Sequence, residues 1–331
     1  MASNRQPVAA VVPASANDQG STSRAGAKSE CNFRNNPPCR ILHQHDTRDL
    51  VLLDRASIDL SHLFSRESEH SSSIVHRMFI LLTNDDGIMA PGIVAMYREL
   101  VKLGDVAVVA PETVQSATRH GITLTAPLLT NRVTIENAFT GTAVDGRPAD
   151  CVKLAVNQLL PRTPNLVVSG INAGANVGVN VIYSGTVAAA IEAAFLGLPS
   201  IAVSLHLSSD VPTDYKRAAE LTLETIRVIL AAGIKGGDVI NVNVPALLEN
   251  ERPKGVKIVR QCTRGFVDTY EKRTDPRGRE YFWNSSVFSL GETEDDTDVA
   301  ALRDKYICVT PLQFDLTHQE SLRSWQNRTW R

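Results

Sequence analysis

The chain has 331 residues, with 34 Lys and Arg against 36 Asp and Glu and a formal net charge of −2. This near balance excludes a polybasic protein that binds a nucleic acid polymer by neutralising its phosphates. No stretch reaches the ~18 consecutive apolar residues that a membrane-spanning helix needs. We therefore expect a cytoplasmic protein with neither a membrane nor a nucleic acid polymer as partner.

The five cysteines are widely spaced and include no C-x-x-C pair. An odd number at such spacings predicts neither a disulfide framework nor a zinc site.

Residues 1–77 differ from the rest of the chain. They show little hydrophobic periodicity and contain five of the 8 histidines, whose spacings form no compact set of metal ligands. The first 28 residues contain few acidic residues and thus weakly resemble an organellar transit peptide, although Pro7 and Pro13 interrupt any amphipathic helix. We predict a disordered extension, or an over-extended gene model whose natural start is Met78; organellar targeting is the alternative.

Strand, polar loop and helix alternate from Met78 onward. Short apolar runs predict strands at 78–82, 106–110, 166–169, 200–204 and 238–244. Helical spacing of apolar residues predicts helices at 91–103, 151–160, 186–198 and 213–232. This order is typical of an α/β fold, a Rossmann-like, mostly parallel sheet with helices on both faces.

The pattern changes again after residue 245. Strands are predicted at 257–260, 281–283 and 307–310, a turn at 275–278, and a helix at 319–330. We expect a core at 78–245, followed at 246–331 by hairpin arms and a terminal helix that serve oligomer contacts.

Three polar loops should meet although they are far apart in the sequence. They begin at Asn84, Pro111 and Gly170, each after a predicted strand. Ligands of such sheets bind at the carboxyl edge, where these loops converge.

Asp85 and Asp86 are adjacent carboxylates at the end of the first predicted strand. Their mutual repulsion is costly without a cation, and a hard divalent ion prefers oxygen ligands. A helix N-cap followed by an acidic first-turn residue explains the pair equally well.

The second loop carries a hydroxyl, a cation and a histidine in Ser116, Arg119 and His120. The hydroxyl could ligate a metal, and the cation could meet an anionic substrate. His120 could act as a general acid, or simply form a hydrogen bond. A solvated surface loop explains the same residues.

The third loop is rich in Gly and Asn and ends in Ser184, Gly185 and Thr186, which open an Ala-rich helix. Backbone N–H groups and hydroxyls at such a helix start can bind phosphate. The spacing matches neither G-x-G-x-x-G nor the P-loop, so a dinucleotide or P-loop site is not predicted. A tight turn with an ordinary N-cap is the alternative.

Four segments closely resemble the survival protein SurE family. They are 79–92 (FILLTNDDGIMAPG), 108–116 (VVAPETVQS), 147–152 (RPADCV) and 166–186 (LVVSGINAGANVGVNVIYSGT). The resemblance covers essentially all of 78–331. It implies a metal-dependent phosphatase of nucleoside monophosphates with a Rossmann-like core, assembled as a homodimer or homotetramer.

The resemblance also implies the site residues. One divalent cation per subunit, Mg²⁺ or Mn²⁺, would be held by Asp85, Asp86, Ser116 and Asn172. Asp85 and Asp86 would be catalytic. The phosphate and substrate would be bound by Asn84, Asn176, Ser184, Gly185 and Thr186.

The chain departs from the family pattern at Ala117, where the family usually has Gly, and at Arg147, where it has Thr. We expect both departures to affect which substrate is preferred more than which reaction is catalysed. The expected function is hydrolysis of nucleoside 5′-monophosphates, with 3′-monophosphates and short polyphosphate as further candidates. A non-catalytic nucleotide sensor is the alternative.

Overall fold

The computed structural model describes residues 77–115, 119–135, 137–264, 269–284, 290–291 and 293–330. The predicted N-terminal extension thus lies outside the described residues, apart from Arg77, as does the predicted ligand Ser116.

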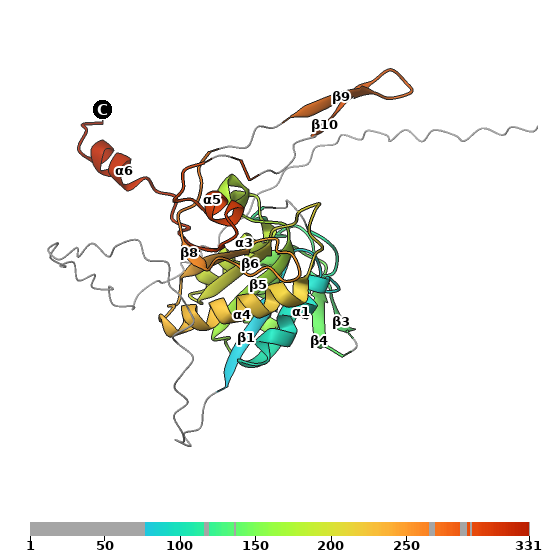
Figure 1. The fold of residues 1–331 in the computed structure, drawn as a ribbon. Helices are drawn as coiled ribbons and strands as arrows, with labels where there is room; N and C mark the ends of the chain where they lie inside the picture. The colour runs from blue at the N-terminus through green and yellow to red at the C-terminus, as the bar shows by residue number, and fades with distance from the viewer. Residues whose placement is uncertain are drawn as a thin grey trace, which may run out of the picture. The chain divides into compact units, whose positions relative to one another are not determined.

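The strands and helices alternate as the sequence predicts (Figure 1). The strands are β1 (Met78–Thr83), β2 (Gly104–Pro111), β3 (Thr130–Thr134), β4 (Thr140–Val144), β5 (Leu166–Ala173), β6 (Ser200–Leu205), β7 (Val239–Val244), β8 (Val256–Ile258), β9 (Tyr270–Thr274), β10 (Glu280–Asn284) and β11 (Ile307–Leu312). The α-helices are α1 (Pro91–Leu100), α2 (Pro148–Leu154), α3 (Gly185–Phe195), α4 (Tyr215–Ala231), α5 (Asp298–Arg303) and α6 (Gln319–Gln326). A π-helical turn, η2 (Ala155–Leu159), extends α2, and a 3₁₀ turn, η3 (Gly178–Ile182), precedes α3.

Within the described chain, nine strands form one sheet in the order β3-β4-β2-β1-β5-β6-β7-β11-β8. The strands from β4 to β7 run parallel to their neighbours, whereas β3 and β11 run antiparallel to β4 and β7. The predicted α/β fold with a mostly parallel sheet is confirmed.

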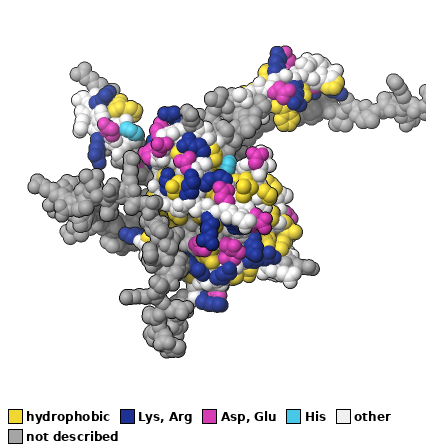
Figure 2. Space-filling view, viewed as in Figure 1, with side chains coloured by type: hydrophobic (Ala, Val, Ile, Leu, Met, Phe, Trp, Pro, Cys, Tyr) yellow, Lys and Arg dark blue, Asp and Glu magenta, His cyan; other side chains and the backbone are white. Residues whose placement is uncertain are grey.

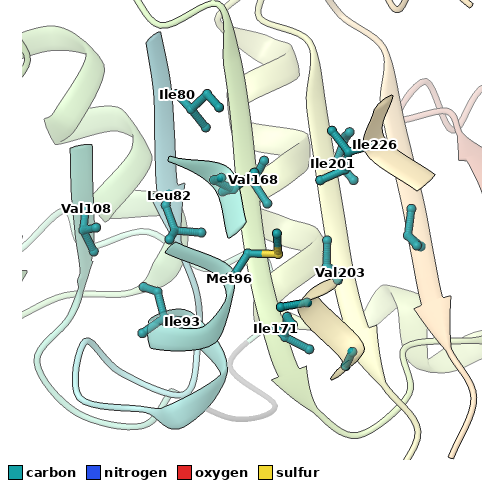
Figure 3. Packing of buried hydrophobic residues seen from close by; sticks show 14 of the residues in the cluster. Ile80, Leu82, Ile93, Met96, Val108, Val168, Ile171, Ile201, Val203 and Ile226 are labelled. Atoms are coloured by element: carbon teal, nitrogen blue, oxygen red, sulfur yellow. The ribbon is translucent and has the colours of Figure 1, made fainter. Parts of the chain in front are cut away.

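The β1 strand shows why the central strands are continuously apolar. Ile80 and Leu82 belong to the cluster that contains α1 and α4 residues, and Leu81 belongs to the cluster with α2 and α3. Alternate side chains of a strand point to opposite faces, so a strand covered by helices on both faces needs no polar side. Figure 3 shows Leu82 beside Met96 of α1 in this packing.

The region after residue 245 contains both arms and sheet. β9 and β10 form an antiparallel hairpin that is separate from the nine-stranded sheet. β8 and β11, however, join the central sheet, because β11 pairs with β7. The sheet thus continues past the boundary that the sequence suggested.

The sequence analysis missed β3, β4, β9 and α5. β3 lies at the sheet edge with mostly exposed side chains, so it has no apolar alternation. The α5 helix has only 6 residues, fewer than helical periodicity needs. No described helix is long and apolar enough to cross a membrane.

Gly92 brings α1 against the end of β5. A Cβ at this position would lie 2.1 Å from the backbone oxygen of Ile171. Only glycine permits this approach, which fixes the strand end immediately before Asn172.

Gly92→Ala should therefore lower the free energy of unfolding by about 1–3 kcal/mol, because α1 must move away from β5. Denaturant unfolding measures the change. Arg98→Ala, at an exposed position of the same helix, is the matched control and should stay within about 0.5 kcal/mol of the parent. Equal stability of the parent and Gly92→Ala would contradict the close packing.

Candidate active site at the carboxyl edge of the sheet

The loops after β1, β2 and β5 meet at the carboxyl edge, as predicted. The backbone N–H of Gln115 donates to the Asp85 carbonyl at 2.7 Å. The backbone N–H of Ala173 donates to Asp86 Oδ2 at 2.9 Å. The first loop is thereby linked to the second through the Asp85 backbone and to the third through the Asp86 carboxylate.

The Asp85 side chain lies at the N-terminus of α3. It is 4% exposed, and the Thr186 hydroxyl donates to its Oδ1 at 2.5 Å. A Cβ at Gly185 would lie 2.9 Å from the Cβ of Asp85, so only glycine leaves room for this carboxylate. Ser184 caps the helix by accepting the Val187 N–H at 3.1 Å. The anion at this helix start is thus the carboxylate of Asp85 itself.

Both carboxyl groups resist ionisation. Burial raises the pKa of Asp85 to about 6; the Thr186 hydrogen bond opposes this shift, and the negative charge of Asp86 adds to it. Burial also raises the pKa of Asp86, against the effect of the Ala173 N–H. Neither group forms an ion pair within the part of the chain that the structure describes. Two acids are therefore neighbours in the chain, and neither pairs with a basic side chain among the described residues.

Asn172 reaches the same place through an irregularity in β5. The pairing of β5 with β6 shifts register between Ser169 and Asn172. A Cβ at Gly170 would lie 2.3 Å from the Val203 backbone oxygen, so this glycine permits close approach to β6. The Asn172 amide group donates to the Gly174 carbonyl at 2.7 Å.

Asn176 is held by polar residues inside the sheet. Its N–H donates to Asn243 Oδ1 at 2.8 Å, and its side-chain amide donates to Ser204 Oγ at 2.8 Å. Its carbonyl accepts from the Asn241 side chain at 2.8 Å. Because these four residues are buried, their hydrogen bonds fix the Gly- and Asn-rich loop in one position.

Asp298 supports the same loop from the C-terminal region. Its carboxylate accepts the backbone N–H of Gly178 at 2.8 Å and that of Cys262 at 2.9 Å. Burial nevertheless raises its pKa. The sequence analysis missed this residue and the supporting polar residues of β6 and β7. Their one signal is a polar residue inside an apolar run, as in VINVNV.

A cavity of about 700 Å³ opens beside these residues. Its lining includes Asp85, Asn172, Asn176, Ser184, Arg119 and His206. This volume is within the range of pockets that hold small-molecule ligands.

Two of the predicted substrate-binding residues, Asn84 and Thr186, lie behind this lining, whereas His120 is exposed. Asn84 is fully buried, and its side-chain amide donates to the Gly87 carbonyl at 2.9 Å. Thr186 is also fully buried and directs its hydroxyl to Asp85. His120 contacts Glu192 Oε2 at 2.9 Å. In this structure Asn84 and Thr186 support the site by internal hydrogen bonds, to the Gly87 carbonyl and to the Asp85 carboxylate.

Among the described residues, no group of three or more His, Cys, Asp or Glu could hold a metal ion. The oxygen donors that do lie together are the two carboxylates and the Asn172 amide. Oxygen donors of this kind suit a hard cation such as Mg²⁺ better than a soft one.

Comparisons with known proteins all identify the same family. The model of the family described as "Survival protein SurE" matches residues 80–268. A protein named 5′-nucleotidase SurE from Syntrophobacter fumaroxidans is 49% identical over 245 residues, covering 74% of this chain and 97% of the relative. One of the same name from Moorella thermoacetica is 46% identical over 257 residues, covering 76% and 98%. The crystal structure of the SurE protein from Aquifex aeolicus matches with a TM-score of 0.65 and 38% identity, covering 74% of this chain and 97% of that one.

The raised pKa of Asp85 predicts a pH-dependent stability. Its folded pKa of about 6 exceeds the ordinary 3.8, so folding favours the protonated acid. That stabilisation is complete below pH ~4 and is lost as the pH rises through ~6. In EDTA, Asp85→Asn should therefore gain stability relative to the parent between pH 4 and 7.5, by at most about 3 kcal/mol. Denaturant unfolding at both pH values measures the difference, and a pH-independent difference would contradict the assignment.

Proposed function

The chain belongs to the survival protein SurE family, and we propose that it is a divalent-metal-dependent 5′-nucleotidase that hydrolyses nucleoside 5′-monophosphates to nucleoside and phosphate. The observation that carries this proposal is the buried Asp85 carboxylate, which lines a cavity large enough for a nucleotide and has the half-buried Asp86 next to it in the chain. The names of the curated relatives, 5′-nucleotidase SurE, support the same reaction.

The donor set fits a divalent cation. Burial raises the pKa of both Asp85 and Asp86, so keeping the two carboxylates ionised costs free energy that a bound cation would offset. We propose that Asp85, Asp86 and Asn172, together with Ser116, would hold one Mg²⁺ or Mn²⁺ per subunit. When bound, such a cation acidifies water and neutralises charge that develops on a phosphoryl group.

The chain's own residues position the reacting groups. Thr186 fixes the Asp85 carboxylate, and the Ala173 N–H fixes that of Asp86. These two carboxylates orient the attacking water and supply the acceptor for its proton. Asn176 and Ser184 line the cavity on the side of α3 and hold the phosphoryl group there.

The proposal extends to assembly and location. Aromatic side chains of β9 and β10 are exposed, namely Tyr270, Tyr281, Phe282 and Trp283. Figure 2 shows hydrophobic side chains beside charged ones on this hairpin. A lone two-stranded hairpin is marginally stable in water, which supports a homodimer or homotetramer in which it gains contacts. We place the protein in the cytoplasm, and we include 3′-monophosphates and short polyphosphate among its substrates.

The test is phosphate release from a panel of nucleotides with Mg²⁺, with Mn²⁺ and with EDTA. Asp85→Asn should lower kcat/KM by more than about 1000-fold while the fold stays intact, and EDTA should abolish turnover. Asp105→Asn is the control, because Asp105 is exposed at the start of β2, away from the carboxyl edge of the sheet. Its carboxylate pairs with Arg77 and Arg162. Nucleotide binding without phosphate release would favour the sensor instead. Undiminished turnover without metal would refute the proposed mechanism.

A further inference from the structure

Arg119 has an unusual backbone conformation next to the cavity. Its φ is 58°, in the left-handed region that favours glycine. A long side chain in this region costs free energy, so the position offers no local advantage to arginine. Any advantage of arginine at position 119 must therefore come from what its side chain contacts.

The loop that carries Arg119 is tied to two helices. His120 contacts Glu192 of α3 at 2.9 Å, and Glu192 also pairs with Lys153 of α2 at 3.2 Å. The Thr123 N–H and hydroxyl donate to Asp150 of α2 at 2.9 and 2.7 Å. His120 and Thr123, which make these contacts, follow Arg119 closely in the chain and hold its backbone in a defined place.

The Arg119 side chain reaches the start of α3. Its guanidinium carbon lies 4.9 Å from the centre of the Tyr183 ring. Tyr183 immediately precedes Ser184, the N-cap of α3. A guanidinium that rests on an aromatic ring keeps its N–H edge available for an anion.

The balance of charge in the cavity calls for such a cation. Arg119 is the one Lys or Arg among the described residues that line it. The start of α3 is already engaged by the Asp85 carboxylate. A divalent ion would only balance the charges of Asp85 and Asp86, and Asn176 and Ser184 are neutral, so the two negative charges of a phosphate monoester still need a cation.

We propose that Arg119 is a phosphoryl-binding residue, which donates hydrogen bonds to the phosphoryl oxygens of the substrate while Tyr183 orients its guanidinium. This inference rests on the proposed phosphatase function. It adds to the site a cation that does not belong to the metal-ligand set.

Arg119→Gly is the sharpest variant, because glycine suits the left-handed backbone and should leave the melting temperature unchanged or higher. We expect kcat/KM for nucleoside monophosphates to fall about 10- to 100-fold, as for the loss of a charge-assisted hydrogen bond. The inhibition constant for inorganic phosphate should rise about tenfold. Arg119→Lys should lie between the parent and the glycine variant, because it keeps the charge without the planar fork.

The control is Arg227→Ala, at an exposed position near the end of α4 and thus toward the opposite edge of the sheet, which should match the parent. Mn²⁺ affinity, measured by calorimetry, should be unchanged in every variant. If Arg119→Gly keeps both the parent's kcat/KM and its inhibition by phosphate, the inference is wrong.

Failure of the proposed function would look different. If the parent protein releases no phosphate from any nucleotide, the phosphatase proposal fails. Phosphate binding to the Mn²⁺-loaded parent and to Arg119→Gly, measured by calorimetry, then decides on Arg119 alone. Equal affinities would overturn the inference, and at least tenfold weaker binding to the variant would support it.

Discussion

The site depends on holding two carboxyl groups of like charge next to each other, one of them buried and the other half-buried. Asp85 is 4% exposed and lies beside Asp86, so burial and, to a smaller extent, the negative charge of Asp86 raise the cost of ionising it. The protein offsets this cost only in part, with the Thr186 hydroxyl, the start of α3 and the Ala173 N–H. A stable fold could have avoided the pair altogether. That it is built in, with a glycine at position 185 to make room, is the physical reason to expect a cation there.

The parallel sheet makes this arrangement possible. Three loops from distant parts of the sequence meet because their strands end at the same edge. The central strands are covered by helices on both faces, so their apolar packing leaves only the edge for polar chemistry. The few polar residues inside β6 and β7 are then used to fix Asn176 from below. The same elements that form the core thus set the geometry of the loops.

Much of the fold and of the site could be predicted from the sequence because both have local signals. The run at 78–82 predicts a buried strand, and the alternation that follows predicts the sheet. The grouping of Asp85, Asp86 and Asn172 follows from the rule for parallel strands. The role of Thr186 could not be predicted, since its hydroxyl points to Asp85 only through a contact between residues 101 positions apart. The support by Asp298 depends in the same way on tertiary contacts with Gly178 and Cys262.

The pairing of β11 with β7 bears on how the chain folds during synthesis. Among the described strands of the sheet, β11 is made last, yet it lies between β7 and β8, which are made earlier. A nascent chain that ends before residue 307 therefore presents β7 as an open strand edge, and β8 has no neighbour in the sheet. Asp298 is equally late, so the loop at Gly178 lacks its anchor until then. The Gly- and Asn-rich loop at the candidate site therefore gains its full support only after the chain has been made through Asp298 and β11.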